Sequence, residues 1–103
     1  MDQATLDLLR KDAARYIWWE TPEEALRHPA RVIAQVMNLG GFEDVQALLD
    51  SLGEGPFREV LRTAEPGWFN ERSWHYWHYA LGLCSPAEPV PPLPARQFDL
   101  AQH

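Results

Sequence analysis

Apolar residues recur along this chain at the three- and four-residue spacing of amphipathic helices, in short runs separated by turn residues. The first run covers residues 4–19, and later runs follow at 29–39, 42–52, 56–64 and 70–81. No stretch sustains the apolar–polar alternation of a half-buried strand, and no Asn-Gly or Asp-Gly hairpin turn occurs. The pattern therefore predicts an all-α fold.

Residues that favour helix starts lie at the beginnings of these runs. Thr21, Pro22 and Glu24 combine a capping box with a proline at the first helical position, which predicts a short helical turn ending near residue 27. Pro56 is expected to start the fourth long run, and Asn70 is a good N-cap for the last one.

Glycines lie at the ends of the runs. Gly53 and Gly82 are expected to stop the helices before them, and Gly40 and Gly41 to end the 29–39 helix with the positive φ of a C-cap. Helices of about ten residues are marginal in isolation and must pack on one another. With connections this short, we expect a compact orthogonal array of about five short helices rather than a long up-down bundle.

Apolar stripes indicate which residues form the core. The stripe of the 42–52 helix comprises Phe42, Val45, Leu48, Leu49 and Leu52. In the last helix, Trp74, Trp77 and Leu81 share one stripe and are predicted to be buried.

The composition changes after Leu83, where five prolines fall between residues 86 and 94. Prolines at this density exclude a helix and favour an extended polyproline-II path. We therefore divide the chain into a helical domain, residues 1–83, and a proline-rich C-terminal arm, residues 84–103. Two interpretations of the arm stay open: a floppy tail, or an arm anchored by Leu93 and Phe98 on its own domain or on a partner.

Composition narrows the class of protein. The chain has 103 residues, 46% of them hydrophobic, which suits one domain with a single core. Its net charge of -6 repels nucleic acid and anionic lipid and suits a basic protein partner. No signal peptide or membrane span is recognisable. The single cysteine, Cys84, cannot form an internal disulfide, which fits a cytoplasmic protein.

The segment from Trp68 to Leu83, WFNERSWHYWHYALGL, holds three of the five Trp and two of the three Tyr. A domain this small cannot easily bury all of these rings, so some are expected at the surface, where aromatic side chains anchor protein contacts. We expect Tyr76 and Tyr79 to be exposed with His75. The predicted partner-binding residues are Trp68, Tyr76, Tyr79, Leu93, Arg96 and Phe98.

Catalytic and metal-binding chemistry find little support. His75 and His78 are three residues apart and could share a helical face, but zinc needs further ligands, and only His28 and the terminal His103 remain. The paired acidic residues at 23–24 and 43–44 fall in first helical turns, where negative charge stabilises the helix. We predict no enzyme activity, no metal and no cofactor.

The segment 45–61, VQALLDSLGEGPFREVL, has the layout of a helix-turn-helix. Its second helix offers Arg58 and Arg62 against Glu59 and Glu65, so its charge is nearly neutral. DNA-binding versions usually present basic and amide side chains there. A DNA-binding autoregulator therefore remains as the alternative function, and nucleic acid is not the expected partner.

The succession RYIWW, RVIAQVMNLGGFEDVQALLDSLG, FREVLRTAE, RSWHYWHYALGL and PPLPARQF resembles a family of small bacterial proteins of unknown function. Its members are typically encoded beside nucleotidyltransferase toxins of the AbiEii/AbiGii type. The resemblance covers residues 16–98 and is most specific at Trp18 and Trp19, at NLGGFEDVQALL and at 77–83.

The resemblance implies an antitoxin-like protein that neutralises such a toxin, and it assigns no catalytic residues. A toxin that handles nucleotides should have an electropositive cleft, which would complement an acidic chain with exposed rings. We therefore expect a non-enzymatic, cytoplasmic protein-binding module. A homo-oligomer is compatible with the sequence, and a membrane is not an expected partner.

Overall fold

A computed structural model describes residues 2–94 of the chain. This part contains six helices and no strand: α1 (Gln3–Tyr16), α2 (Pro22–Ala25), α3 (Pro29–Leu39), α4 (Phe42–Leu52), α5 (Glu54–Arg62) and α6 (Glu71–Ala80). The all-α prediction is confirmed. The described residues form six helices where about five were expected, and the short turn predicted after Thr21 is one of them, a helix of four residues.

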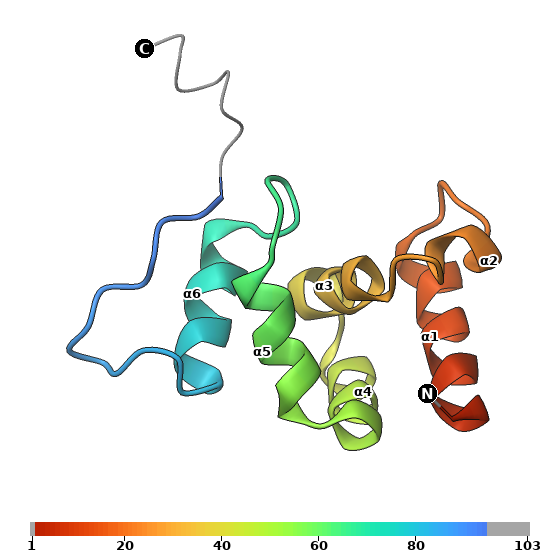
Figure 1. Ribbon diagram of the computed structural model, residues 1–103, viewed down its shortest axis with the longest axis horizontal. Coiled ribbons are helices and arrows are strands. Elements are labelled where there is room, and N and C mark those ends of the chain that lie inside the picture. Colours follow the sequence, from red (N-terminus) through yellow and green to blue (C-terminus); the bar gives the residue numbers. More distant parts are fainter. Residues whose placement is uncertain (1, 95–103) are drawn as a thin grey trace, which may run out of the picture.

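Helix α3 is the centre of the fold. It contacts each of the other five helices (Figure 1), with α1 and α2 on one side and α5 and α6 on the other. Its Val32 and Val36 are fully buried, and the predicted stripe Trp74, Trp77 and Leu81 is buried against the same core. A short helix buried on several sides is stabilised by packing rather than by its own propensity.

Local chemistry sets several helix ends as predicted. The Thr21 hydroxyl accepts a hydrogen bond from the Glu24 amide at 3.2 Å, and the Asn70 side chain accepts one from the Ser73 amide at 2.8 Å. These contacts satisfy amides that have no partner within the helix. Gly53 and Gly82 follow helix ends with φ of 77° and 73°, a region that favours glycine.

The predicted role of Gly40 and Gly41 is wrong in its mechanism. Both lie at helix boundaries, but their φ values are -69° and -73°. A Cβ on Gly40 would lie 2.5 Å from the carbonyl oxygen of Val36, whereas a Cβ on Gly41 would meet nothing within 4 Å. Glycine at position 40 therefore permits a close approach of the backbone, not a left-handed turn.

Two helix boundaries also differ from the prediction. Helix α1 ends at Tyr16 rather than Trp19, since Ile17 leaves helical geometry and is buried, while the Tyr16 carbonyl accepts from the Gln35 side chain at 3.0 Å. Helix α5 begins at Glu54 rather than Pro56. Pro56 falls in its first turn, where a missing N–H removes no helical hydrogen bond.

The described part of the chain contains no helix with the length and apolar character that crossing a membrane requires. The longest, α1, has 14 residues, against the roughly 20 that a bilayer demands.

Candidate protein-binding surface

Phe42 and Tyr76 are exposed aromatic rings that line one hollow in the surface. Phe42 is 80% exposed and Tyr76 61% exposed, although they come from different helices, α4 and α6. The hollow has a volume of about 460 Å³, and Met37, Val45 and Trp77 contribute apolar surface to it. The polar residues Asn38, Asn70, Arg72 and Ser73 line the rest of it. Large exposed rings beside a depression of mixed character are typical of protein-binding surfaces.

Hydrogen bonds between α3 and the α6 region hold this hollow in shape. The Trp77 indole donates to the Met37 carbonyl at 2.9 Å. The Asn38 side chain accepts from the Asn70 amide at 3.1 Å, and the Asn38 carbonyl accepts from the Ser73 hydroxyl at 3.3 Å. A surface that is already ordered loses less conformational freedom on binding.

Helix α4, which begins at Phe42, carries acidic side chains and no lysine or arginine. Asp44 accepts from the Tyr16 hydroxyl and pairs with Arg15 at 3.1 Å. This hydrogen bond to Asp44 raises the pKa of Tyr16. Glu43 and Asp50 make no ion pair with any residue in the described range 2–94. Glu43 and Asp44 line a separate depression beside Arg15 and Tyr16, whereas the charged side chain that lines the hollow itself is Arg72.

The prediction that Phe42 belongs to the buried stripe of its helix is wrong. Leu48 is buried, and Val45, Leu49 and Leu52 pack against the core, but Phe42 is exposed. As the first residue of α4 it follows the Gly40–Gly41 corner, outside the part of the helix that faces its neighbours. Helical spacing alone does not distinguish such a terminal position from a core position.

Trp18 and Trp19 form a second exposed aromatic group, in the turn between α1 and α2. Trp18 is 79% exposed, and its ring packs edge-to-face on Trp19 with centroids 5.5 Å apart. The Arg31 guanidinium lies 5.5 Å from the centre of the Trp19 ring, a cation–π contact. The expected first helix would have ended on these residues; the turn instead leaves them at the surface.

The predicted partner-binding residues do not form one site. Tyr76 lies at the hollow described above, whereas Trp68 is half-buried beside His28 and Arg31 in another depression. Tyr79 is 41% exposed. Leu93 is half-buried and packs against the core of its own chain. Arg96 and Phe98 lie outside the described residues.

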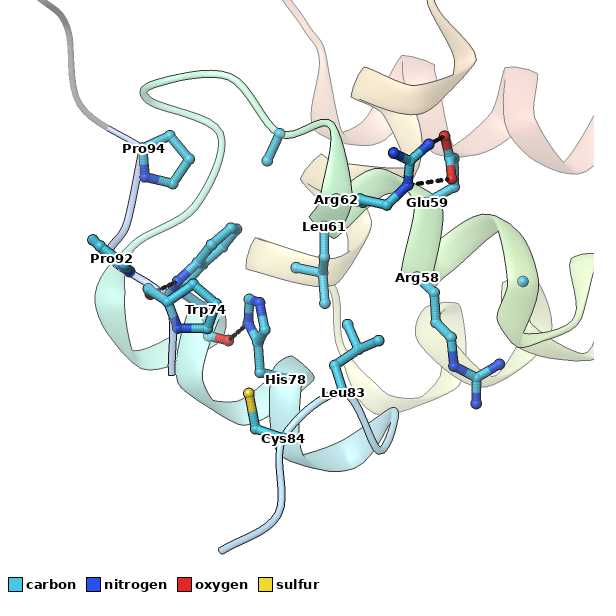
Figure 2. A pocket seen from close by; sticks show the side chains of 13 residues that line it. Arg58, Glu59, Leu61, Arg62, Trp74, His78, Leu83, Cys84, Pro92 and Pro94 are labelled. Carbon is cyan, nitrogen blue, oxygen red and sulfur yellow. Dashed lines mark hydrogen bonds and ion pairs between the residues drawn. The ribbon is translucent and has the colours of Figure 1, made fainter. Parts of the chain in front are cut away.

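The first part of the proline-rich arm lies beside α6. The Trp74 indole donates to the carbonyl of Pro91 at 2.8 Å, and the Tyr79 hydroxyl donates to that of Glu88 at 3.4 Å. A cavity of about 550 Å³ opens between α5, α6 and these arm residues (Figure 2).

The two histidines of α6 have different surroundings. His78 is buried, with Nδ1 2.7 Å from the Trp74 carbonyl and its ring edge-on to Trp74. His75 is exposed, with Nδ1 2.8 Å from the Glu71 carbonyl. Among residues 2–94, no three His, Cys, Asp or Glu side chains come together as metal ligands.

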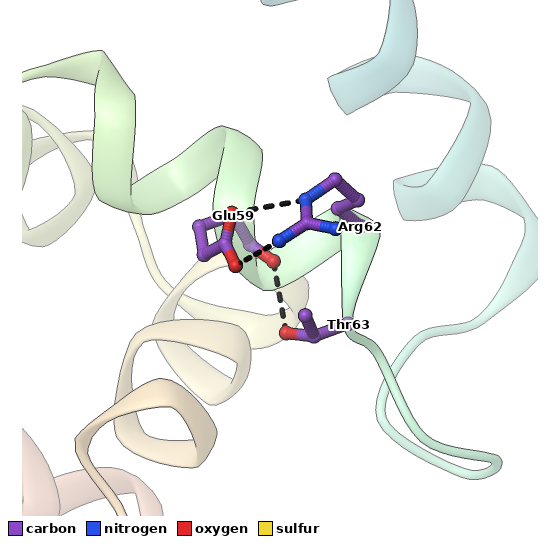
Figure 3. Close-up of polar contacts among 3 residues, drawn as sticks. All are labelled: Glu59, Arg62 and Thr63. Atoms are coloured by element: carbon purple, nitrogen blue, oxygen red, sulfur yellow. Dashed lines mark hydrogen bonds and ion pairs between the residues drawn. The ribbon is translucent and has the colours of Figure 1, made fainter.

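The two arginines of α5, which contains the second helix of the helix-turn-helix-like segment, pair with acidic side chains. Arg62 makes two hydrogen bonds to the Glu59 carboxylate, and the Thr63 hydroxyl donates to the Glu59 carbonyl (Figure 3). The Arg62 contact lowers the pKa of Glu59. Arg58 pairs with Glu54 and also donates to the Leu81 carbonyl at 3.0 Å. Both guanidinium groups thus have carboxylate partners on their own helix.

Asp12 is a buried carboxylate that sequence reasoning missed. Its side chain is 1% exposed, and its Oδ2 has no hydrogen-bond partner among the described residues. Burial, reinforced by the charge of Asp44, raises the pKa of Asp12 from 3.8 to about 6. No catalytic motif surrounds Asp12 in the sequence. In the structure Asp12 lines neither the hollow beside Tyr76, nor the depression beside Trp68, nor the cavity beside Trp74.

Comparison with protein-family models, with curated proteins and with solved structures finds no match to this chain.

Proposed function

We propose that this chain is a non-enzymatic protein-binding module and the antitoxin-like partner of a nucleotidyltransferase toxin. The observation that carries the proposal is the hollow between Phe42 and Tyr76, where two exposed rings border a depression held in shape by hydrogen bonds. Such rings supply binding energy without any catalytic group.

Charge supports a basic partner. The net charge is -6, and α4 carries Glu43, Asp44 and Asp50 without a basic residue, although Asp44 is paired with Arg15 and Arg72 lines the hollow itself. These carboxylates would complement the electropositive cleft expected of a protein that handles nucleotides. The toxin class itself follows only from the resemblance of the sequence to proteins encoded beside AbiEii/AbiGii-type toxins.

The alternative, a helix-turn-helix-like autoregulator, has weaker support. Its second helix would present Arg58 and Arg62 to DNA, but both are paired with carboxylates of the same helix. Phosphate binding would have to break those pairs or recruit arginines from elsewhere.

The test is co-expression of this chain with the toxin from the neighbouring reading frame. Restored growth and co-purification of a stoichiometric complex are the expected results. Toxicity that persists while both proteins are soluble and separate would contradict the proposal. A toxin with an inactivated active site serves as a binding partner that does not limit growth.

A further inference from the structure

The arm residues 89–94, PVPPLP, lie along α6, and we call this segment the strap. Four of its six residues are proline. The strap carbonyl of Pro91 accepts a hydrogen bond from the Trp74 indole at 2.8 Å. Val90 and Leu93 pack against the core. Trp74, His78, Pro92 and Pro94 surround one side of the cavity in Figure 2.

These contacts match the way proteins recognise proline-rich segments. Proline fixes φ and removes the backbone donor, so such a segment is extended before it binds and loses little entropy. Grooves that bind it offer aromatic side chains, and Trp74 here adds an indole N–H directed at a carbonyl. Residues between the prolines, Val90 and Leu93, supply the apolar contacts.

The strap is held less firmly than the helices. Residues 89–94 make no backbone–backbone hydrogen bond within the described part of the chain. By contrast, the Trp77 indole on the same helix donates to the Met37 carbonyl inside α3. A segment held by side-chain contacts alone opens at a lower free energy than the helical core. The cavity of about 550 Å³ along the strap leaves room for it to move.

We propose that α6 carries a proline-recognition groove built on Trp74, and that the strap fills it as an exchangeable ligand in cis. A proline-rich segment of a partner protein binds the same groove when the strap leaves. This groove is separate from the hollow between Phe42 and Tyr76, and the proposal does not depend on the identity of the toxin.

The two indole N–H groups of α6 test the exchangeability of the strap in the unmodified chain. Hydrogen exchange followed by NMR should be at least about tenfold faster at Trp74 than at Trp77, and at Trp74 nearly independent of low urea concentrations. Equal rates with equal urea dependence would show that the strap opens only with the whole domain, which would overturn the proposal.

Binding in trans uses the full-length variant Val90→Asp/Leu93→Asp, which weakens the strap and keeps Trp74. The probe is a synthetic PAEPVPPLP peptide, and the matched control peptide carries Asp in place of its valine and its leucine, PAEPDPPDP. The first peptide should shift the Trp74 indole resonance saturably, at an affinity at least about tenfold above the control.

Absence of peptide binding to the folded variant would overturn the proposal. Size-exclusion chromatography with light scattering checks that the variant is a monomer, so that no second copy fills its groove. If the variant does not fold, the exchange rates of Trp74 and Trp77 in the unmodified chain decide.

Discussion

The indole of Trp77 donates to the backbone carbonyl of Met37 over 2.9 Å, joining two residues 40 positions apart. This bond fastens α6 to the central helix α3 and lies under the hollow between Phe42 and Tyr76. The packing of Trp77 on Phe57, with ring centroids 5.4 Å apart, extends the same junction to α5.

Replacing Trp77 by phenylalanine should therefore destabilise the fold. The substitution leaves the buried Met37 carbonyl without its donor and removes part of the ring, so we expect a loss of about 2–4 kcal/mol in the free energy of unfolding. Urea unfolding followed by circular dichroism measures it. Tyr76→Phe, an exposed neighbour, is the control and should change stability by less than about 0.5 kcal/mol. Equal midpoints for both variants would contradict the role of the bond.

Asp12 should make the stability of the protein depend on pH. Its pKa in the folded chain is raised from 3.8 to about 6, so the folded state binds more protons than the unfolded state between these values. Stability contributed by this residue should fall by about 2–3 kcal/mol as pH rises from about 4 to about 6.

Asp12→Asn removes this titration, and the variant should be about 1–2 kcal/mol more stable than the natural chain at pH 7. Asp7→Asn, an exposed position on the same helix, is the matched control. Unfolding in urea at several pH values gives the comparison. A natural chain and an Asp12→Asn variant with parallel pH profiles would show that Asp12 does not titrate in this range.

The two glycines between α3 and α4 should respond differently to alanine. A Cβ at position 40 would lie 2.5 Å from the Val36 carbonyl oxygen, so Gly40→Ala should cost about 1–3 kcal/mol. Gly41→Ala has open space, and its effect should stay within about 0.5 kcal/mol because a stiffer unfolded chain offsets a poorer helix cap. Thermal unfolding measures both effects. A larger loss of stability in Gly41→Ala than in Gly40→Ala would contradict the close approach of the backbone at Gly40.

Phe42 and Tyr76 should carry binding to the toxin partner. Phe42→Ala or Tyr76→Ala should weaken the complex by about 2–4 kcal/mol, roughly 30- to 1000-fold in affinity. Both side chains are exposed, so circular dichroism should remain unchanged. Trp18→Ala, an equally exposed ring in the turn after α1, is the matched control. Full-strength binding by both hollow variants, with loss in Trp18→Ala, would move the interface to the α1–α2 turn.

Binding to duplex DNA should be weak and insensitive to sequence. The net charge is -6, and Arg58 and Arg62 are paired with Glu54 and Glu59. The protein should therefore attract DNA phosphates only weakly. Titration of the chain with its own promoter region, in about 0.15 M salt, tests this. Sequence-dependent nanomolar binding would make the autoregulator the leading function.

The sequence alone predicts those structural features that depend on residues close together in the chain. The caps at Thr21 and Asn70 and the stops at Gly53 and Gly82 act within one helical turn, so residue type and spacing predict them. The stripe of Trp74, Trp77 and Leu81 repeats at helical spacing, and it is buried as expected.

Tertiary structure decided what depends on distant residues. Phe42 belongs to an apolar stripe by spacing, but the packing of α4 leaves it facing the hollow beside Tyr76. The 2.5 Å approach at Gly40, the pairing of the Trp74 indole with Pro91 and the burial of Asp12 near Asp44 all involve groups that the chain path brings together. Helical periodicity reports which side chains share a face, whereas the position of each helix in the fold determines whether that face is covered.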